Sequence, residues 1–530
     1  MLSIDDCPRH RLDSTVHRFN LTRSGAIPGA LAGLLAVAVM LLLGRLWDAP
    51  VPPQLLADRI TAALPVETFG SILGSLESAA KPLLFIVLLL GQVAVGALLT
   101  ALAEPYLRRG GDPSWVFLGL LAIVFGLLAL VIAPLGGIGV AGIDAPEGAT
   151  LAIVAFFAVA LSYAAPAVSW LSSDAGRSTD TPDEGRRRLI RVAAVSVPAL
   201  LAAGYIGRFL VGLGSGSQAS NGRESTASGL PPALTPTEDF YVVSKNFVDP
   251  NVTLDNWALQ VDGLVDRPRS YRYDELRALP ATTKTTTLEC ISNEVGGSYI
   301  STGEWTGVLL RDLLDEAGVR PEVVDVVLHA ADGYADSFPL AAAMDPDTIV
   351  VYDLNGAPLT RDHGFPLRVI VPGIFGMKNV KWLERISLVD EDFKGYWQDR
   401  GWSDLATVVT MSRIDQPADG ASVLAGAQTT IGGVAFAGDR GIRKVEVSLD
   451  DGVSWREAAI EPPLSPLTWV RWTLPWTPED RGSAWSTSLT VRAWDGAGAV
   501  QTDDESPPLP DGATGYHRIG VKVRAAGDTA

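Results

Sequence analysis

The chain has 530 residues, of which 47% are apolar and only 19% are charged, and its formal net charge is −18. This length predicts about three domains, and the apolar content excludes a largely disordered chain. The whole acidic excess lies in residues 236–530, because acidic and basic residues cancel in residues 1–235. We expect no binding to nucleic acid, which requires a cationic surface.

Cysteine and histidine are scarce. The two cysteines, Cys7 and Cys290, lie far apart in the chain, which excludes a disulfide framework, a cysteine-ligated iron–sulfur cluster and a CxxCH haem attachment. None of the five histidines lies in a long apolar stretch. A haem held by histidines between membrane helices is therefore excluded as well.

The first part of the chain contains five apolar stretches that are long enough to cross a bilayer. They are approximately residues 26–47, 82–103, 114–134, 149–171 and 190–212. No small-residue cleavage site follows the first stretch, so we interpret it as a retained helix and not as a signal peptide. An amphipathic piece, residues 53–80, is expected to lie on the membrane surface.

The arginine distribution predicts the orientation in the membrane. Arginines concentrate before the first stretch, after the second and before the fifth, which places the N-terminus in the cytoplasm and everything after residue 214 outside the plasma membrane. The segment before the fifth stretch, GRRRLIRVAAVSVPALLAAG, also resembles a twin-arginine export signal. Ordinary positive-inside charge explains it equally well.

Composition and periodicity divide the chain into four parts. Residues 1–212 form the membrane domain, 213–236 a flexible Gly/Ser/Pro-rich linker, 237–400 an α+β domain and 401–530 an antiparallel β-sandwich. Residues 257–265 alternate like a strand. Residues 306–319 predict a helix that ends at Gly318 and carries Leu309, Leu310, Leu313 and Leu314 on one face.

Two segments of the α+β domain could carry chemistry. Cys290 ends a β-prone run, TTTLEC, before a polar loop. It is either a small buried side chain or a reactive thiolate that serves as nucleophile or soft metal ligand. The stretch HGFPLRVIVPGIFGMKNVKWL contains glycines that permit close approach, and His363, Arg368, Lys378 and Lys381 could donate to an anion such as phosphate.

Together these segments resemble the sulfite oxidase family of molybdenum enzymes. The resemblance rests on Cys290-Ile-Ser-Asn293, on the stretch that begins at His363, and on downstream GDRGIRKVEVSLDDGVSW, WTLPWTP and LTVRAWDGAG. It implies that the five transmembrane helices predicted from the apolar stretches are followed by an α+β molybdopterin-binding domain like that of sulfite oxidase and then by an immunoglobulin-like β-sandwich.

The resemblance also implies roles for individual residues. Cys290 would be the catalytic thiolate ligand of molybdenum in a molybdenum-molybdopterin cofactor. The residues expected to bind the cofactor are Tyr241, Ser244, Lys245, Asn246, Asp332, His363, Arg368, Asn379, Val380 and Lys381.

Departures from the family pattern concern the substrate. Sulfite oxidases surround their substrate anion with arginines, and those positions hold Val243, Val295 and Leu509 here, while Glu294 adds a negative charge. Sulfite would be poorly held without compensating cations. We therefore expect a sulfoxide or an N-oxide as the substrate.

The sequence thus predicts a membrane-anchored oxidoreductase that faces the periplasm or cell exterior and transfers an oxygen atom or two electrons. It needs a separate electron carrier, a cytochrome or a quinone, since its own sequence has no haem or iron–sulfur motif. The C-terminal domain mediates dimers in soluble relatives. Whether this chain forms a homodimer through that domain is left open. The alternative is a non-catalytic membrane-anchored receptor or scaffold with a vestigial cofactor site.

Overall fold

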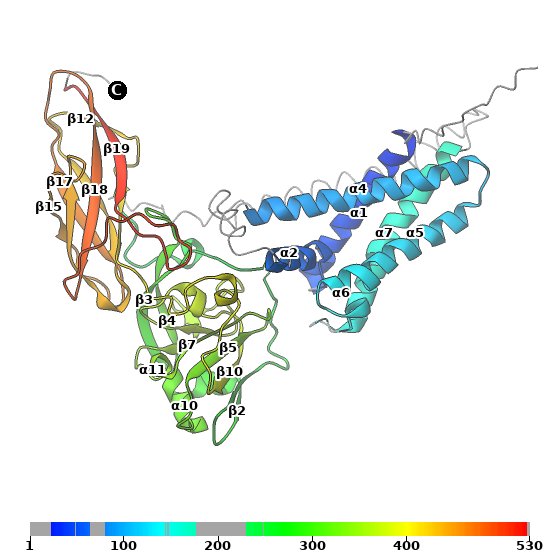
Figure 1. The fold of residues 1–530 in the computed structure, drawn as a ribbon, viewed down its shortest axis with the longest axis horizontal. Helices are drawn as coiled ribbons and strands as arrows, with labels where there is room; N and C mark the ends of the chain where they lie inside the picture. The colour runs from blue at the N-terminus through cyan, green and yellow to red at the C-terminus, as the bar shows by residue number, and fades with distance from the viewer. Residues whose placement is uncertain are drawn as a thin grey trace, which may run out of the picture. The chain divides into compact units, whose positions relative to one another are not determined.

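The computed structural model describes residues 23–63, 80–175 and 229–526, except positions 48, 144, 146, 147, 247 and 248. The chain divides into two compact units, one of apolar helices and one built mainly of strands (Figure 1). The predicted fifth membrane span, the paired arginines before it and residues 213–228 of the predicted linker lie outside the described residues.

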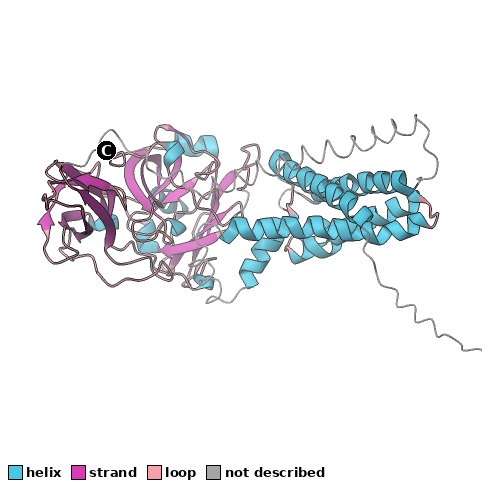
Figure 2. Cartoon of the chain, turned by 90° about the horizontal axis from the view of Figure 1, so that it is seen from above, coloured by secondary structure: helices cyan, strands magenta, loops and turns pink. Residues whose placement is uncertain are grey.

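The first unit is helical (Figure 2). Its α-helices are α1 Arg23–Trp47, α2 Pro52–Ala63, α4 Ala80–Arg108, α5 Pro113–Leu127, α6 Ala133–Leu135 and α7 Ala149–Ala175, with a π-helical segment, Leu128–Ile132, between α5 and α6. Four stretches are long and apolar enough to cross a membrane: Gly25–Trp47, Leu83–Arg108, Pro113–Leu135 and Ala149–Ser172. Four of the five predicted spans therefore correspond to helices. Helix α2 occupies the first part of the predicted amphipathic piece.

Close packing and satisfied polar groups hold these helices together. A Cβ atom added to Gly29 of α1 would stand only 2.6 Å from the carbonyl oxygen of Gly96 in α4. Tyr163 of α7 donates its hydroxyl to that same carbonyl across 2.6 Å, and Thr100 Oγ1 lies 2.6 Å from the tyrosine oxygen. Small residues at helix contacts and hydrogen bonds between helices stabilise helix association in an apolar environment.

The α+β domain contains two sheets. One has the order β2-β1-β10-β5-β6, and the other has the order β3-β4-β7-β8 with β9 paired to β7. The strands are β1 Ala258–Gly263, β2 Arg269–Arg272, β3 Thr282–Glu289, β4 Ile300–Leu309, β5 Asp325–Ala330, β6 Ala335–Pro339, β7 Ile349–Leu354, β8 Ala357–Pro358, β9 Arg368–Ile370 and β10 Leu383–Val389. The α-helices are α9 Tyr273–Ala278, α10 Leu310–Ala317 and α11 Leu340–Ala343.

Helix α10 is shorter than the sequence predicts. Leu310, Leu313 and Leu314 are buried on its inner face, and Gly318 ends it with a φ of 76°. Such a left-handed conformation favours glycine. Leu309 does not belong to this helical face, because it is the last residue of β4 and pairs with Ile349 of β7.

The C-terminal domain is the predicted sandwich. Its sheets have the orders β11-β13-β17-β16 and β12-β19-β18-β14-β15. The strands are β11 Met411–Gln416, β12 Ser422–Leu424, β13 Thr429–Phe436, β14 Ile442–Ser448, β15 Arg456–Glu457, β16 Ala459–Ile460, β17 Val470–Trp476, β18 Trp485–Asp495 and β19 His517–Arg524. Apolar residues of both sheets, Trp472 and Val491 among them, share one buried core.

A separate apolar cluster joins the sandwich to the α+β domain. It contains Ile291, Ile300 and Phe375 from the α+β domain and Met411 and Phe436 from the sandwich, all buried. The two domains therefore share a core through their interface.

The end of the predicted linker is fixed to this unit. Leu230 is buried, the amide of Thr235 donates to Thr302 O across 2.8 Å, and Arg471 donates to Pro231 O across 3.2 Å. Residues 229–236 thus contact both domains and are not a free tether, because their backbone groups are hydrogen-bonded.

Candidate functional site

Cys290 lies at the start of a closed loop between β3 and β4. Its amide donates to Tyr299 O across 3.0 Å, which closes residues 290–299 at their base. The thiol is buried, and Sγ lies 3.0 Å from Ser292 Oγ. The β-prone run before Cys290 therefore delivers the thiol to the edge of a sheet, as the sequence predicts.

Asn293, the last residue of the Cys-x-x-Asn motif, braces this loop. Its side-chain oxygen accepts from the amide of Tyr299 at 2.9 Å, and its side-chain nitrogen donates to Glu289 Oε1 at 2.9 Å. Burial raises the pKa of Glu289 to about 7. The loop is thus tied to the strand that carries the cysteine.

An aromatic side chain faces the cysteine. Tyr241 stacks on Phe240, with ring centroids 5.7 Å apart, and its pKa is raised by burial and by the nearby Cys290. Its buried hydroxyl has no hydrogen-bond partner among the described residues. A Cβ atom on Gly376 would stand 2.5 Å from that hydroxyl. Glycine at this position therefore lets the Tyr241 hydroxyl approach the backbone closely.

The stretch that begins at His363 contributes donors to the same region. His363 Nε2 donates to Thr237 O across 3.0 Å, and burial lowers the pKa of this histidine to about 4, so it is neutral. Arg368 Nε donates to Asn379 O across 3.1 Å, and its guanidinium lies 5.4 Å from the ring centroid of Trp305. Burial lowers the pKa of Arg368 to about 10.

Lys381 adds a second cation near Arg368. Its amine donates to Asp362 O across 3.0 Å and lies 4.3 Å from the ring centroid of Trp382. Desolvation lowers its pKa to about 8, and the nearby charge of Arg368 contributes to the shift. In these bonds both cations donate to neutral carbonyl oxygens, and the carboxylates of Asp249, Asp332 and Asp362 partly offset the desolvation of Lys381.

Residues 240–246, which the family resemblance aligns with a first cofactor-binding strand, form no strand here, and Lys245 and Asn246 of this segment contact Asp332. Asn246 Nδ2 donates to Asp332 Oδ2 across 2.7 Å, and Lys245 Nζ lies 3.4 Å from the same oxygen. The amide of Asn246 bonds Ser244 Oγ at 3.1 Å, while Asp332 Oδ1 accepts from the amide of Tyr334 at 2.9 Å. The structure therefore brings the consecutive residues Ser244, Lys245 and Asn246 together with Asp332, which lies 86 residues after Asn246.

The side chains of two residues that were predicted to bind the cofactor make structural contacts within the domain. Asn379 is buried, accepts from the amide of Val371 at 2.7 Å and donates to Phe375 O at 3.2 Å, so its side chain stabilises the loop. Val380 packs in the main core of the α+β domain. Neither side chain is free to contact a cofactor, and contact through their backbone stays a prediction.

Lys378 is also not an anion donor. Its amine lies 3.0 Å from Asp336 Oδ1 and donates to Ser337 O at 2.6 Å, and the whole side chain is buried. The short 3₁₀ turn Gly376–Lys378 directs it into the domain. Lys378 is thus a structural ion-pair partner beneath the glycine-containing loop.

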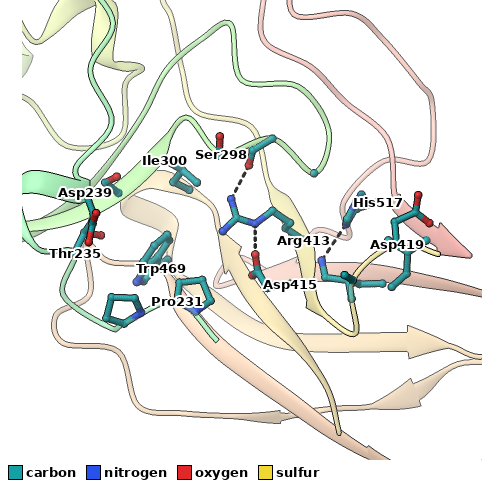
Figure 3. A pocket seen from close by; sticks show the side chains of 17 residues that line it. Pro231, Thr235, Asp239, Ser298, Ile300, Arg413, Asp415, Asp419, Trp469 and His517 are labelled. Carbon is teal, nitrogen blue, oxygen red and sulfur yellow. Dashed lines mark hydrogen bonds and ion pairs between the residues drawn. The ribbon is translucent and has the colours of Figure 1, made fainter. Parts of the chain in front are cut away.

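A cavity of about 230 Å³ adjoins residues 296–298 of the Cys290 loop (Figure 3). Arg413 and His517, from the sandwich, line it together with Gly296 and Gly297 of the loop. Sequence reasoning did not single out these two side chains, because no motif or spacing relates them to Cys290.

The residues around Cys290 fit a metal-bearing organic anion. A buried thiol is a soft metal ligand once it is deprotonated. For the organic part, the Tyr241 hydroxyl, which has no partner among the described residues, offers a hydrogen bond, and Arg368 and Lys381 offer positive charge.

Two family models match the strand-rich unit. An "Oxidoreductase molybdopterin binding domain" matches residues 246–397, and a "Mo-co oxidoreductase dimerisation domain" matches residues 405–524.

Curated relatives agree with these matches. Mitochondrial sulfite oxidase of Rattus norvegicus is 35% identical over 289 residues, covering 46% of this chain and 52% of that protein. Sulfite oxidase of Gallus gallus is 31% identical over 324 residues, covering 52% and 69%. An uncharacterized oxidoreductase of Bacillus subtilis is 34% identical over 181 residues, covering 34% and 89%. The chain spans about half the length of the mammalian relatives.

A solved structure, that of the sulfane dehydrogenase SoxCD from Paracoccus pantotrophus, is 26% identical in sequence. The match covers 56% of this chain and 82% of that chain, with a TM-score of 0.47.

Proposed function

The chain belongs to the sulfite oxidase family of molybdopterin oxidoreductases, and we propose that it is a membrane-anchored member whose substrate is a small neutral sulfoxide or N-oxide. Membership of an oxidoreductase family decides against the alternative of a non-catalytic receptor. The family also implies a molybdenum-molybdopterin cofactor, which supplies oxygen-atom or two-electron transfer chemistry when bound.

We assign the binding of this cofactor to the residues around the Cys290 loop. The Cys290 thiolate would bind the metal, and Arg368 and Lys381 would bind the anionic part of the organic group. Neutral His363 would keep Thr237 in place through its hydrogen bond. The hydroxyl of Tyr241, which has no partner among the described residues, would gain one.

The observation that carries the substrate proposal is the exposure of two apolar side chains where sulfite oxidases have arginines. Val243 and Val295 are 38% and 37% exposed, and Glu294 beside Val295 is exposed too. None of these three residues offers a cation to a dianion such as sulfite, and Glu294 would repel it. A neutral substrate loses less solvation on entering such a site.

Anchoring and partners complete the proposal. Four apolar helices support a membrane anchor, and the arginine distribution supports an extracytoplasmic site. A separate cytochrome or quinone would exchange electrons with the site. The matched dimerisation domain supports a homodimer.

A substrate screen tests the proposal. Full-length protein in detergent is assayed with a redox dye against sulfite, dimethyl sulfoxide and trimethylamine N-oxide. We expect turnover with one or both oxides, at a higher kcat/KM than with sulfite, and none in the Cys290→Ser variant. Preferential oxidation of sulfite would refute the substrate assignment, and full activity of Cys290→Ser would refute the role of the thiolate.

A further inference from the structure

Arg413 of β11 reaches from the sandwich to the Cys290 loop. Its Nη1 donates to Gly297 O across 2.6 Å, while its Nε bonds Asp415 Oδ1 across 2.8 Å (Figure 3). The side chains of Arg413 and Asp415 are only 7% and 9% exposed. The carboxylate thus fixes the guanidinium, and the guanidinium fixes one carbonyl of the loop.

His517, at the start of β19, contacts the same loop at Gly296, the residue before Gly297. Its Nδ1 accepts from the amide of Ile414 at 3.0 Å, which orients the ring. A Cβ atom added to Gly296 would stand 2.3 Å from His517 Nε2. Gly296 has a φ of 78°, so both its conformation and its contact with the ring require glycine.

The loop is stiff enough to transmit a shift from these glycines to the cysteine. The Cys290–Tyr299 backbone bond closes it, and Asn293 joins Tyr299 to Glu289. Val295, which stands where sulfite oxidases have a substrate-binding arginine, directly precedes Gly296 in the chain.

We propose that Arg413 and His517 are positioning residues, which act through Gly297 and Gly296 to set the orientation of the Cys290 thiolate and the place of Val295. This inference rests on the proposed function, because it takes Cys290 as the metal ligand. The sandwich would then complete the active site in addition to any role in dimerisation.

Docking of the two domains alone does not account for these contacts. The apolar cluster of Ile291, Ile300, Phe375, Met411 and Phe436 already joins the domains. A buried ion pair stabilises a fold little compared with apolar residues of similar volume, because both charges lose water. Arg413 donates to one particular carbonyl oxygen, that of Gly297. Such a specific contact fixes the position of the loop against the sandwich.

The test compares Arg413→Gln with a matched control. Arg471→Gln removes a similar arginine of the sandwich, which bonds Glu461 at 2.9 Å and Pro231 O at 3.2 Å, and neither partner belongs to residues 290–299. The full-length proteins are purified in detergent, their molybdenum content is measured, and the Mo(V) electron paramagnetic resonance spectrum is recorded during reductive titration with dithionite. That spectrum responds to the orientation of the thiolate and needs no substrate.

We expect Arg413→Gln to keep its molybdenum but to show shifted Mo(V) g-values, with kcat lowered on the order of tenfold to a hundredfold on the oxide substrate. Arg413→Lys should recover part of the wild-type spectrum, and Arg471→Gln should match the wild type. If Arg413→Gln does not fold, His517→Asn and Gly296→Ala take its place, and both should shift the spectrum.

Wild-type spectra in all loaded variants of Arg413, His517 and Gly296 would overturn the inference and leave the proposed function intact. Equal shifts in Arg413→Gln and Arg471→Gln would also overturn it, because they would reveal a general effect of destabilising the sandwich. Absence of molybdenum from the wild-type protein would instead overturn the proposed function, and this inference with it.

Discussion

Lys378 Nζ lies 3.0 Å from Asp336 Oδ1, and these side chains are only 2% and 1% exposed. Removing one partner of such a pair leaves the other charge buried, at a cost of about 3–5 kcal/mol. We expect Lys378→Met to lower the free energy of unfolding by that amount in denaturant titrations. Lys381→Met should have little effect on stability but should lower cofactor retention. Equal losses of stability in the two variants would contradict the distinction between a structural and a binding lysine.

The Tyr241→Phe substitution should have different effects on the apo-protein and on the cofactor-loaded protein. Leaving a buried polar group without a partner costs about 1–3 kcal/mol, and the Tyr241 hydroxyl has none among the described residues. In protein from a host that cannot make the cofactor, the phenylalanine variant should therefore be as stable as the wild type or more so. In loaded protein it should release molybdopterin faster. A less stable apo-variant, judged by its melting temperature, would show that the hydroxyl already has a partner.

Val295→Arg tests the basis of substrate choice. A guanidinium at this exposed position would supply one of the cations that hold sulfite in the family, so the KM for sulfite should fall at least severalfold. Val453→Arg is the control, because Val453 is 85% exposed in the sandwich and far along the chain from Cys290. No change for sulfite in Val295→Arg, or equal changes in both variants, would mean that position 295 does not line the substrate site.

His363 makes stability depend on pH. Its pKa is lowered from 6.5 to about 4, first because burial disfavours the charged ring and then because Arg368 and Lys381 are close. Between these two values the unfolded chain binds a proton that the folded chain does not, so the free energy of unfolding falls as the pH falls from about 6.5 to 4. The full loss is about 3 kcal/mol.

The measurement for this prediction is the unfolding free energy of wild-type and His363→Gln protein at several pH values. The difference between the two should narrow as the pH falls through this window and should stay constant above it. A difference that does not change with pH would mean that the histidine titrates normally in the folded state.

Local patterns in the sequence predicted much of the fold. Alternation identified β1, clustered leucines identified α10, and apolar runs identified four helices long enough to cross a membrane. Leu309 was misplaced because hydrogen-bond pairing with Ile349 extends β4 to the first turn of the helix. Tertiary pairing of this kind overrides a helical pattern.

Motifs in the sequence indicated several candidate site residues. Contacts that arise only when distant segments fold together could not be predicted. The sequence singled out Cys290, His363 and Arg368 from their segments, and their roles at the site stay predictions. Lys378 and Lys381 look alike in the sequence, but the 3₁₀ turn Gly376–Lys378 directs only Lys378 into the domain. Arg413 lies 116 residues from the carbonyl that it holds, so no local pattern could reveal that contact.

Metal and pterin analysis of the full-length protein tests the central claim most directly. Molybdenum measured by mass spectrometry and pterin released on denaturation should each approach one per chain in the wild type, with the molybdenum lost in Cys290→Ser and retained in Cys7→Ser. A wild-type protein without molybdenum, when produced in a host that makes the cofactor, would contradict the account.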